Sequence, residues 1–80
     1  MTHLRVMLHT IQDVQRFVHI VNEFPYDVDL ISGRYVVDAK SIMGIFSLNL
    51  DEVIDVRIHS QDCQDLLTKL ETFRAAELAN

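Results

Sequence analysis

Hydrophobic and polar residues alternate in some segments of the chain and recur at helical spacing in others. Alternation over Leu4–Leu8 and over Val53–Ile58 predicts two half-buried strands. Two further short apolar runs, Val28–Leu30 and Tyr35–Val37, lie on either side of Ser32-Gly33. Because glycine tolerates positive φ, these two runs are predicted to form a β-hairpin.

Two helices and a shorter one are predicted between these strands and after them. Thr10 and Asp13 form the Thr-x-x-Asp pattern of a capping box at the start of the first helix. Pro25 ends that helix, because the residue before a proline disfavours the α region. Ser41–Leu48 has room for about two helical turns, and the last helix begins near Asp62. The predicted buried stripes are Val14, Phe17, Val18 and Val21 in the first helix, and Leu66, Leu67, Leu70 and Phe73 in the last.

The order of these elements is strand, helix, strand, strand, short helix, strand, helix. An α+β fold follows, in which two long helices and a short one cover one face of a four-stranded antiparallel sheet. The 80 residues fit one domain, spanning residues 1–80.

The charge balance is acidic, with 12 Asp and Glu against 7 Lys and Arg and a formal net charge of −5. Nucleic acids and anionic membranes both favour a cationic face, so neither is expected as a partner. Met1–Leu8 has no long apolar stretch, and no window approaches the length of a membrane span. The chain is therefore predicted to be cytoplasmic.

Few residues offer chemistry of their own. Cys63 is the only cysteine, so neither an intrachain disulfide nor a cysteine zinc cluster can form. His3, His9, His19 and His59 are scattered without the spacing of metal ligands. No phosphate-binding glycine loop or nucleophile motif is present. We therefore expect no metal, no cofactor and no enzymatic activity.

One segment carries a specific resemblance. Asp38–Leu48 reads D-A-K-S-I-M-G-I-F-S-L. It resembles the N-A-K-S-I-M-G-x-M-S-L signature around the regulatory serine of HPr, the phosphocarrier of the bacterial sugar phosphotransferase system. Eight of the eleven letters match in register, and the order of elements also agrees with an HPr-like open-faced sandwich. The resemblance therefore covers essentially the whole chain.

The chain departs from the family at the phosphocarrier motif. HPr proteins carry G-L-H-x-R-P where the first strand meets the first helix, and its histidine takes the phosphoryl group. Here the corresponding residues read L-H-T-I-Q-D from Leu8 to Asp13. A gapless alignment puts Thr10 at the histidine position, whereas a gap of one residue puts His9 there. The arginine and the proline of the motif are missing in both alignments.

The resemblance makes Ser41 a candidate phosphorylation site for an ATP-dependent serine kinase, as in low-GC Gram-positive bacteria. Lys40 is adjacent and is a candidate to assist, although Ser41 also suits a simple helix cap. Ile42, Met43 and Phe46 share one side of the short helix. The Ser41–Leu48 segment holds more apolar residues than a narrow helix can bury, so an exposed docking surface is expected there. Its predicted partner-binding residues are Lys40, Ile42, Met43 and Phe46.

The leading hypothesis is an HPr-like regulatory or adaptor protein that docks partners through the Ser41 helix. Its implied partners are a serine kinase, components of the phosphotransferase system or a transcriptional regulator. One alternative is a phosphocarrier that uses His9. Another, from a different class, is a small ligand-sensing domain of the ferredoxin-like type. The sequence leaves the oligomeric state open.

Overall fold

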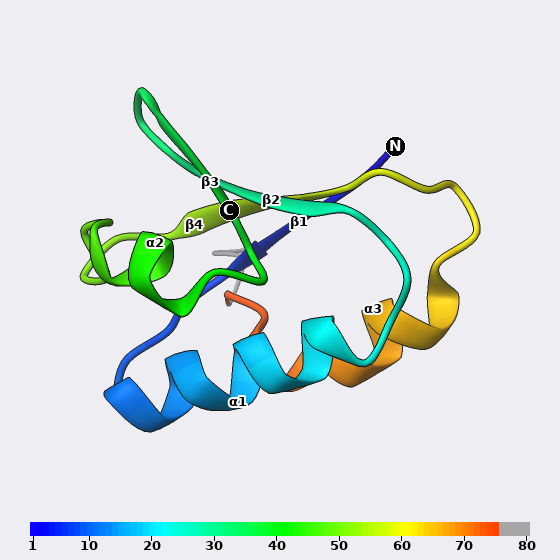
Figure 1. The fold of residues 1–80 in the computed structure, drawn as a ribbon, viewed down its shortest axis with the longest axis horizontal. Helices are drawn as coiled ribbons and strands as arrows, with labels where there is room; N and C mark the ends of the chain where they lie inside the picture. The colour runs from blue at the N-terminus through cyan, green and yellow to red at the C-terminus, as the bar shows by residue number, and fades with distance from the viewer. Residues whose placement is uncertain (76–80) are drawn as a thin grey trace, which may run out of the picture.

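A four-stranded antiparallel sheet forms one layer of the molecule, shown in Figure 1 as a computed structural model that describes residues 1–75. The strand order is β1-β4-β2-β3, so β4 lies between β1 and β2. β4 pairs on both sides, and its residue Val56 lies opposite Leu4 of β1 and opposite Leu30 of β2. The strands are β1 (Thr2–Val6), β2 (Val28–Ser32), β3 (Tyr35–Asp38) and β4 (Ile54–Ile58).

Helices cover one face of this sheet, and Figure 1 shows α1 and α3 side by side beneath it. They are α1 (Ile11–Asn22), α2 (Ile42–Phe46), α3 (Gln64–Leu70) and the 3₁₀ turn η1 (Glu71–Phe73). The predicted α+β open-faced sandwich is confirmed. The last helix is shorter than expected, however. Its α-helical part ends at Leu70, and Phe73 reaches the core from the tighter 3₁₀ turn that follows.

The core lies between the sheet and the helices. On β4, Ile54, Val56 and Ile58 are buried while Asp55 and Arg57 face solvent, as the alternation predicts. The first helix contributes Val14, Phe17 and Val21, and the last contributes Leu66, Leu70 and Phe73. Two members of the predicted stripes, Val18 and Leu67, are only half-buried. Each lies at the margin of its helix's apolar stripe.

The β2–β3 hairpin turns at Gly33 and Arg34. Ser32 pairs with Tyr35 across this two-residue loop. Gly33 has a φ of 59°, a conformation that strains residues with a side chain. A glycine at the first central position is typical of a type II′ turn, whose twist suits the two strands. In Figure 1 the hairpin projects beyond the rest of the sheet.

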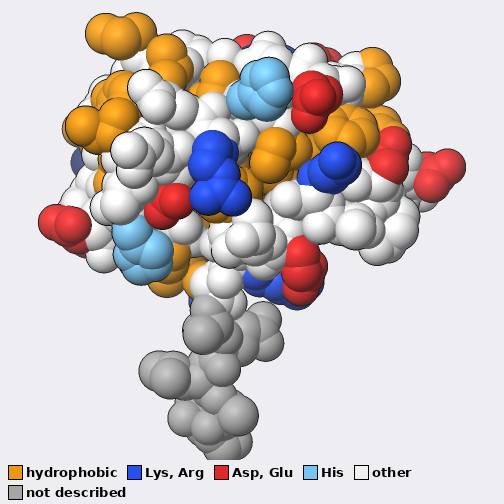
Figure 2. Space-filling view, turned by 90° about the horizontal axis from the view of Figure 1, so that it is seen from below, with side chains coloured by type: hydrophobic (Ala, Val, Ile, Leu, Met, Phe, Trp, Pro, Cys, Tyr) orange, Lys and Arg blue, Asp and Glu red, His pale blue; other side chains and the backbone are white. Residues whose placement is uncertain are grey.

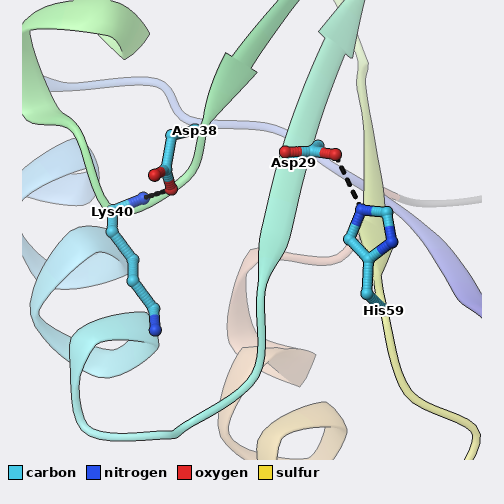
Figure 3. Close-up of polar contacts among 4 residues, drawn as sticks. All are labelled: Asp29, Asp38, Lys40 and His59. Atoms are coloured by element: carbon cyan, nitrogen blue, oxygen red, sulfur yellow. Dashed lines mark hydrogen bonds and ion pairs between the residues drawn. The ribbon is translucent and has the colours of Figure 1, made fainter.

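Two polar contacts fix segments that are far apart in sequence. On the face of the sheet away from the helices, Nε2 of His59 lies 2.7 Å from Oδ2 of Asp29 (Figure 3). This contact links the end of β4 to β2. Below the sheet, the Tyr26 hydroxyl lies 3.0 Å from Asp65 Oδ1 and 3.1 Å from the Asp62 carbonyl. It thereby ties the α1–β2 connection to the start of α3.

The Tyr26 contact predicts a dependence on alkaline pH. The hydrogen bond to the Asp65 carboxylate raises the pKa of the Tyr26 hydroxyl above its ordinary value of 10.0, and desolvation adds to the effect. The folded state therefore favours the neutral phenol. Its stabilising effect is present below pH 10.0 and is lost as the pH rises through the folded-state pKa. Asp65→Asn removes the carboxylate and should lower the pKa of Tyr26 in an ultraviolet titration. A Tyr26 pKa that is the same in wild type and variant would contradict this contact.

Candidate functional site

The start of α1 carries the first candidate residue, His9. Thr10 is the N-cap, and its Oγ1 accepts a hydrogen bond of 3.0 Å from the Asp13 backbone N–H. The Asp13 carboxylate reaches back to accept from the His9 backbone N–H, also at 3.0 Å. In the usual capping box the second hydrogen bond is donated by the backbone N–H of the N-cap residue itself. Here it is donated by His9, the residue before the N-cap. The sequence pattern alone did not predict this direct contact between Asp13 and His9.

An acidic side chain, Asp13, lies in the first turn of α1, beside the His9 backbone N–H. Helix N-termini attract anions through free backbone N–H groups and the helix dipole. Here one such N–H, that of Asp13, donates to the Thr10 hydroxyl, and the Asp13 carboxylate brings a negative charge into the first turn. His9 is exposed. The negatively charged Asp13 carboxylate already lies against the His9 backbone.

The second candidate, Ser41, lies at the start of α2. Its Oγ accepts from the Gly44 backbone N–H at 3.3 Å, so Ser41 is the N-cap of this helix. The turn that leads into α2 is fixed by Asp38, whose carboxylate accepts from the Lys40 N–H and whose carbonyl accepts from the Ser41 N–H. The Ser41 side chain is exposed. It is therefore within reach of a partner protein.

Gly44 allows this turn to pack closely against the sheet. A Cβ at Gly44 would lie 3.3 Å from the Ser41 Oγ and 3.4 Å from the Val37 Cβ. A side chain there would crowd the Ser41 hydroxyl that caps the helix, which would have to shift by a few tenths of an ångström. The glycine in the matched signature therefore has a packing function in this chain.

Lys40 points away from Ser41. Its Nζ donates to the Phe24 carbonyl, just beyond the C-terminus of α1, at 3.1 Å. Figure 3 shows the Lys40 side chain extended in that direction, while its backbone N–H meets Asp38. A cation at a helix C-terminus interacts favourably with the helix dipole. In this structure Lys40 therefore joins α1 to the α2 turn, and its ammonium group is already engaged there.

The apolar residues of α2 divide between the core and the surface. Ile45 is fully buried and Ile42 is half-buried. In contrast, Met43 is 77% exposed and Phe46 is 40% exposed. The expectation that these apolar side chains cannot all be buried is confirmed. In the helical face shown in Figure 2, hydrophobic side chains gather at the upper left, on the side where α2 lies in Figure 1. We call Ile42, Met43 and Phe46 the α2 patch.

The remaining candidates do not form a site in the part of the chain that the structure describes. His3, His19 and His59 lie on the surface. Among residues 1–75, no three His, Cys, Asp or Glu side chains are grouped to hold a metal ion. No helix in that range combines the length and apolar character needed to cross a membrane.

The comparison with protein families identifies the chain. The family model described as "PTS HPr component phosphorylation site" matches residues 9–76. This match covers most of the sequence, so the chain belongs to the HPr family of the phosphotransferase system. The ligand-sensing alternative is therefore not favoured. A comparison with curated proteins found no match.

Solved structures with the same fold include three bacterial proteins. HPr-C-His from Thermoanaerobacter tengcongensis has 22% identity and a TM-score of 0.75, covering 90% of this chain and 89% of that chain. The phosphocarrier protein HPr from Bacillus anthracis strain Ames has 25% identity and a TM-score of 0.72, covering 92% and 96%. The catabolite repression containing protein Crh from Bacillus subtilis has 30% identity and a TM-score of 0.64, covering 84% and 79%. Crh forms a domain-swapped, intertwined dimer.

The cap at the start of α1 predicts a measurable contribution to stability. Thr10→Ala removes the side chain that accepts from the Asp13 N–H and should lower the free energy of unfolding by about 1 kcal/mol. Urea denaturation measures this change. Thr10→Ser keeps a hydroxyl at the same position and is the matched control. Equal stability of the Thr10→Ala and wild-type proteins would show that the cap contributes nothing.

Proposed function

We propose that this chain is a regulatory or adaptor member of the HPr family, which docks partner proteins through α2 and is phosphorylated on Ser41. The observation that carries the proposal is the α2 patch, where Met43 is 77% exposed directly beside an exposed Ser41. An exposed methionine next to an aromatic side chain adapts readily to a partner surface. A phosphate on Ser41 would add nearly two negative charges at the edge of that patch.

The family signature supports the same region. Ala39–Gly44 matches the serine-containing part of the signature letter for letter. The buried residues of this segment pack in the core, and the exposed ones face solvent. Ile45 and Ala39 are fully buried and hold the turn against the core. Packing leaves Met43 and Ser41 free to contact another protein. The similarity to Crh, a protein of catabolite repression, also favours regulation. A serine kinase, a phosphotransferase component or a transcriptional regulator fits this surface.

The alternative is a phosphocarrier that accepts its phosphoryl group on His9. Membership of the HPr family and the exposure of His9 favour it. The local chemistry disfavours it, because the Asp13 carboxylate lies against the His9 backbone N–H. A phosphoryl dianion on His9 would be repelled by that carboxylate. No arginine occupies position 11 or 12 to offset the charge.

Phosphorylation assays separate the two functions. The pure protein, mixed with the general phosphotransferase enzyme and labelled phosphoenolpyruvate, should stay unlabelled. With an HPr serine kinase and labelled ATP, it should gain an acid-stable label that Ser41→Ala abolishes. Phosphohistidine is acid-labile and phosphoserine is not, so an acid quench identifies the residue type. Acid-labile label that His9→Ala removes would instead establish the phosphocarrier function.

The α2 patch predicts a separation of binding from stability. Met43→Glu changes an exposed side chain, so unfolding free energy should stay within about 0.5 kcal/mol of wild type. Binding to the serine kinase should weaken by about 2 kcal/mol or more, as for a central contact residue. Scanning calorimetry measures the unfolding, and titration calorimetry measures the binding to the kinase. Val53→Glu introduces the same charge at another exposed apolar residue and is the matched control. Equal kinase affinity of the two variants would exclude the patch as the docking surface.

A further inference from the structure

The open edge of the sheet is formed by β3, a strand of four residues. β3 is last in the strand order, and among residues 1–75 no strand pairs with its outer side. Natural edge strands are commonly protected by short length, charged residues, proline or a covering element; β3 is short, but it contains neither lysine nor proline. The residues of β3 read Y-V-V-D, with Tyr35 67% exposed and Val36 59% exposed. These residues differ from those of the α2 patch, although α2 itself packs against β3 at Val37.

Backbone geometry identifies which groups of β3 face outward. The Ala39 N–H donates to the Val28 carbonyl at 2.9 Å, so Ala39 directs its polar groups toward β2. Residues alternate along an antiparallel strand, which means that Tyr35 and Val37 also face β2. Val36 therefore presents its backbone N–H and carbonyl to the open side. At the ends of this edge, Arg34 lies in the turn before β3, and the Asp38 carbonyl already accepts from the Ser41 N–H. These two residues therefore offer their charged side chains to the open side.

The charges at the two ends of this edge are opposite and unpaired. Neither Arg34 nor Asp38 forms an ion pair within residues 1–75. Asp38 also lies directly across from Asp29 in the sheet, and like charges in that position are unfavourable. His59 contacts Asp29, while among residues 1–75 the carboxylate of Asp38 receives only the Lys40 backbone N–H (Figure 3). The carboxylate of Asp38 thus lacks a cation in the described part of the chain.

The strand is complementary to itself when it is reversed. In an antiparallel pair centred on Val36, that residue lies opposite its own copy and can exchange reciprocal backbone hydrogen bonds. Tyr35 then lies across from Val37 of the second copy. Arg34 lies across from Asp38 of the second copy, and the same contact repeats on the other side of the axis. Each side chain of the edge therefore meets an apolar or oppositely charged partner.

We propose that the β3 edge binds a second copy of this chain, through an antiparallel β3–β3 contact centred on Val36 with reciprocal Arg34–Asp38 ion pairs. The result is one continuous eight-stranded sheet with two-fold symmetry. The contact is small beside the interfaces of stable dimers, and the net charge of −5 opposes it. We therefore expect a dissociation constant on the order of 0.1–1 mM.

Charge reversal tests the register of this contact. Arg34→Glu leaves two acidic residues facing each other across the axis, so it should remove self-association in sedimentation equilibrium at about 1 mM protein. Asp38→Lys should also remove self-association, because Arg34 then faces a lysine of the second copy. An equimolar mixture of these variants should associate again, because each contact then joins opposite charges. Lys69→Glu makes the same charge change as Arg34→Glu on exposed α3 and should associate like wild type.

Each outcome decides the proposal. Asp38→Lys also removes the acceptor for the Lys40 N–H, so circular dichroism must first show that this variant is folded. If it is not, the comparison of Arg34→Glu with Lys69→Glu is sufficient. A wild-type protein that stays monomeric at about 1 mM would overturn the proposal. So would a dimer that Arg34→Glu leaves intact, as expected for strand exchange or for contact through the α2 patch.

Discussion

The pairing of β4 with two strands at once is the constraint on which the rest of the structure depends. β1 and β2 come from different parts of the chain and do not pair with each other; each pairs with β4. The inward side chains Ile54, Val56 and Ile58 are fully buried, and burial of each stabilises the fold by roughly 1.5–3 kcal/mol. Without β4 the sheet would divide into an isolated strand and an isolated hairpin. The helices would then lose the surface on which they pack.

Features that depend on neighbouring residues could be predicted from the sequence. The alternation of Val53–Ile58 identified a strand, although not its central position in the sheet. Gly33 identified the hairpin, and Thr10 with Asp13 identified the start of α1. These signals are local, because a strand's two faces and a helix cap involve residues within a few positions. The boundaries were less well defined. The last helix gave way to a 3₁₀ turn after Leu70, and from this turn Phe73 reaches the core and packs edge-to-face against Phe17.

Contacts between distant residues could not be predicted in the same way. Nothing near Lys40 in the sequence indicates that its ammonium group meets the Phe24 carbonyl. The same is true of the Tyr26 hydroxyl at Asp65 and of His59 at Asp29. At the candidate site, the segment Asp38–Leu48 located Ser41 and the α2 patch. The exposure of each apolar side chain was visible only once α2 had been placed against β3 by the close approach at Gly44.

The position of β1 has a consequence for synthesis of the chain on the ribosome. β1 pairs with residues 48 to 56 positions later in the sequence, from Val6 with Ile54 to Thr2 with Ile58. Its other edge receives the Ala75 N–H at the Arg5 carbonyl. β1 is translated before β4, so a nascent chain must hold β1 without this partner strand until β4 has emerged. Until then Leu4 and Val6, which are buried in the folded protein, stay exposed to chaperone contact.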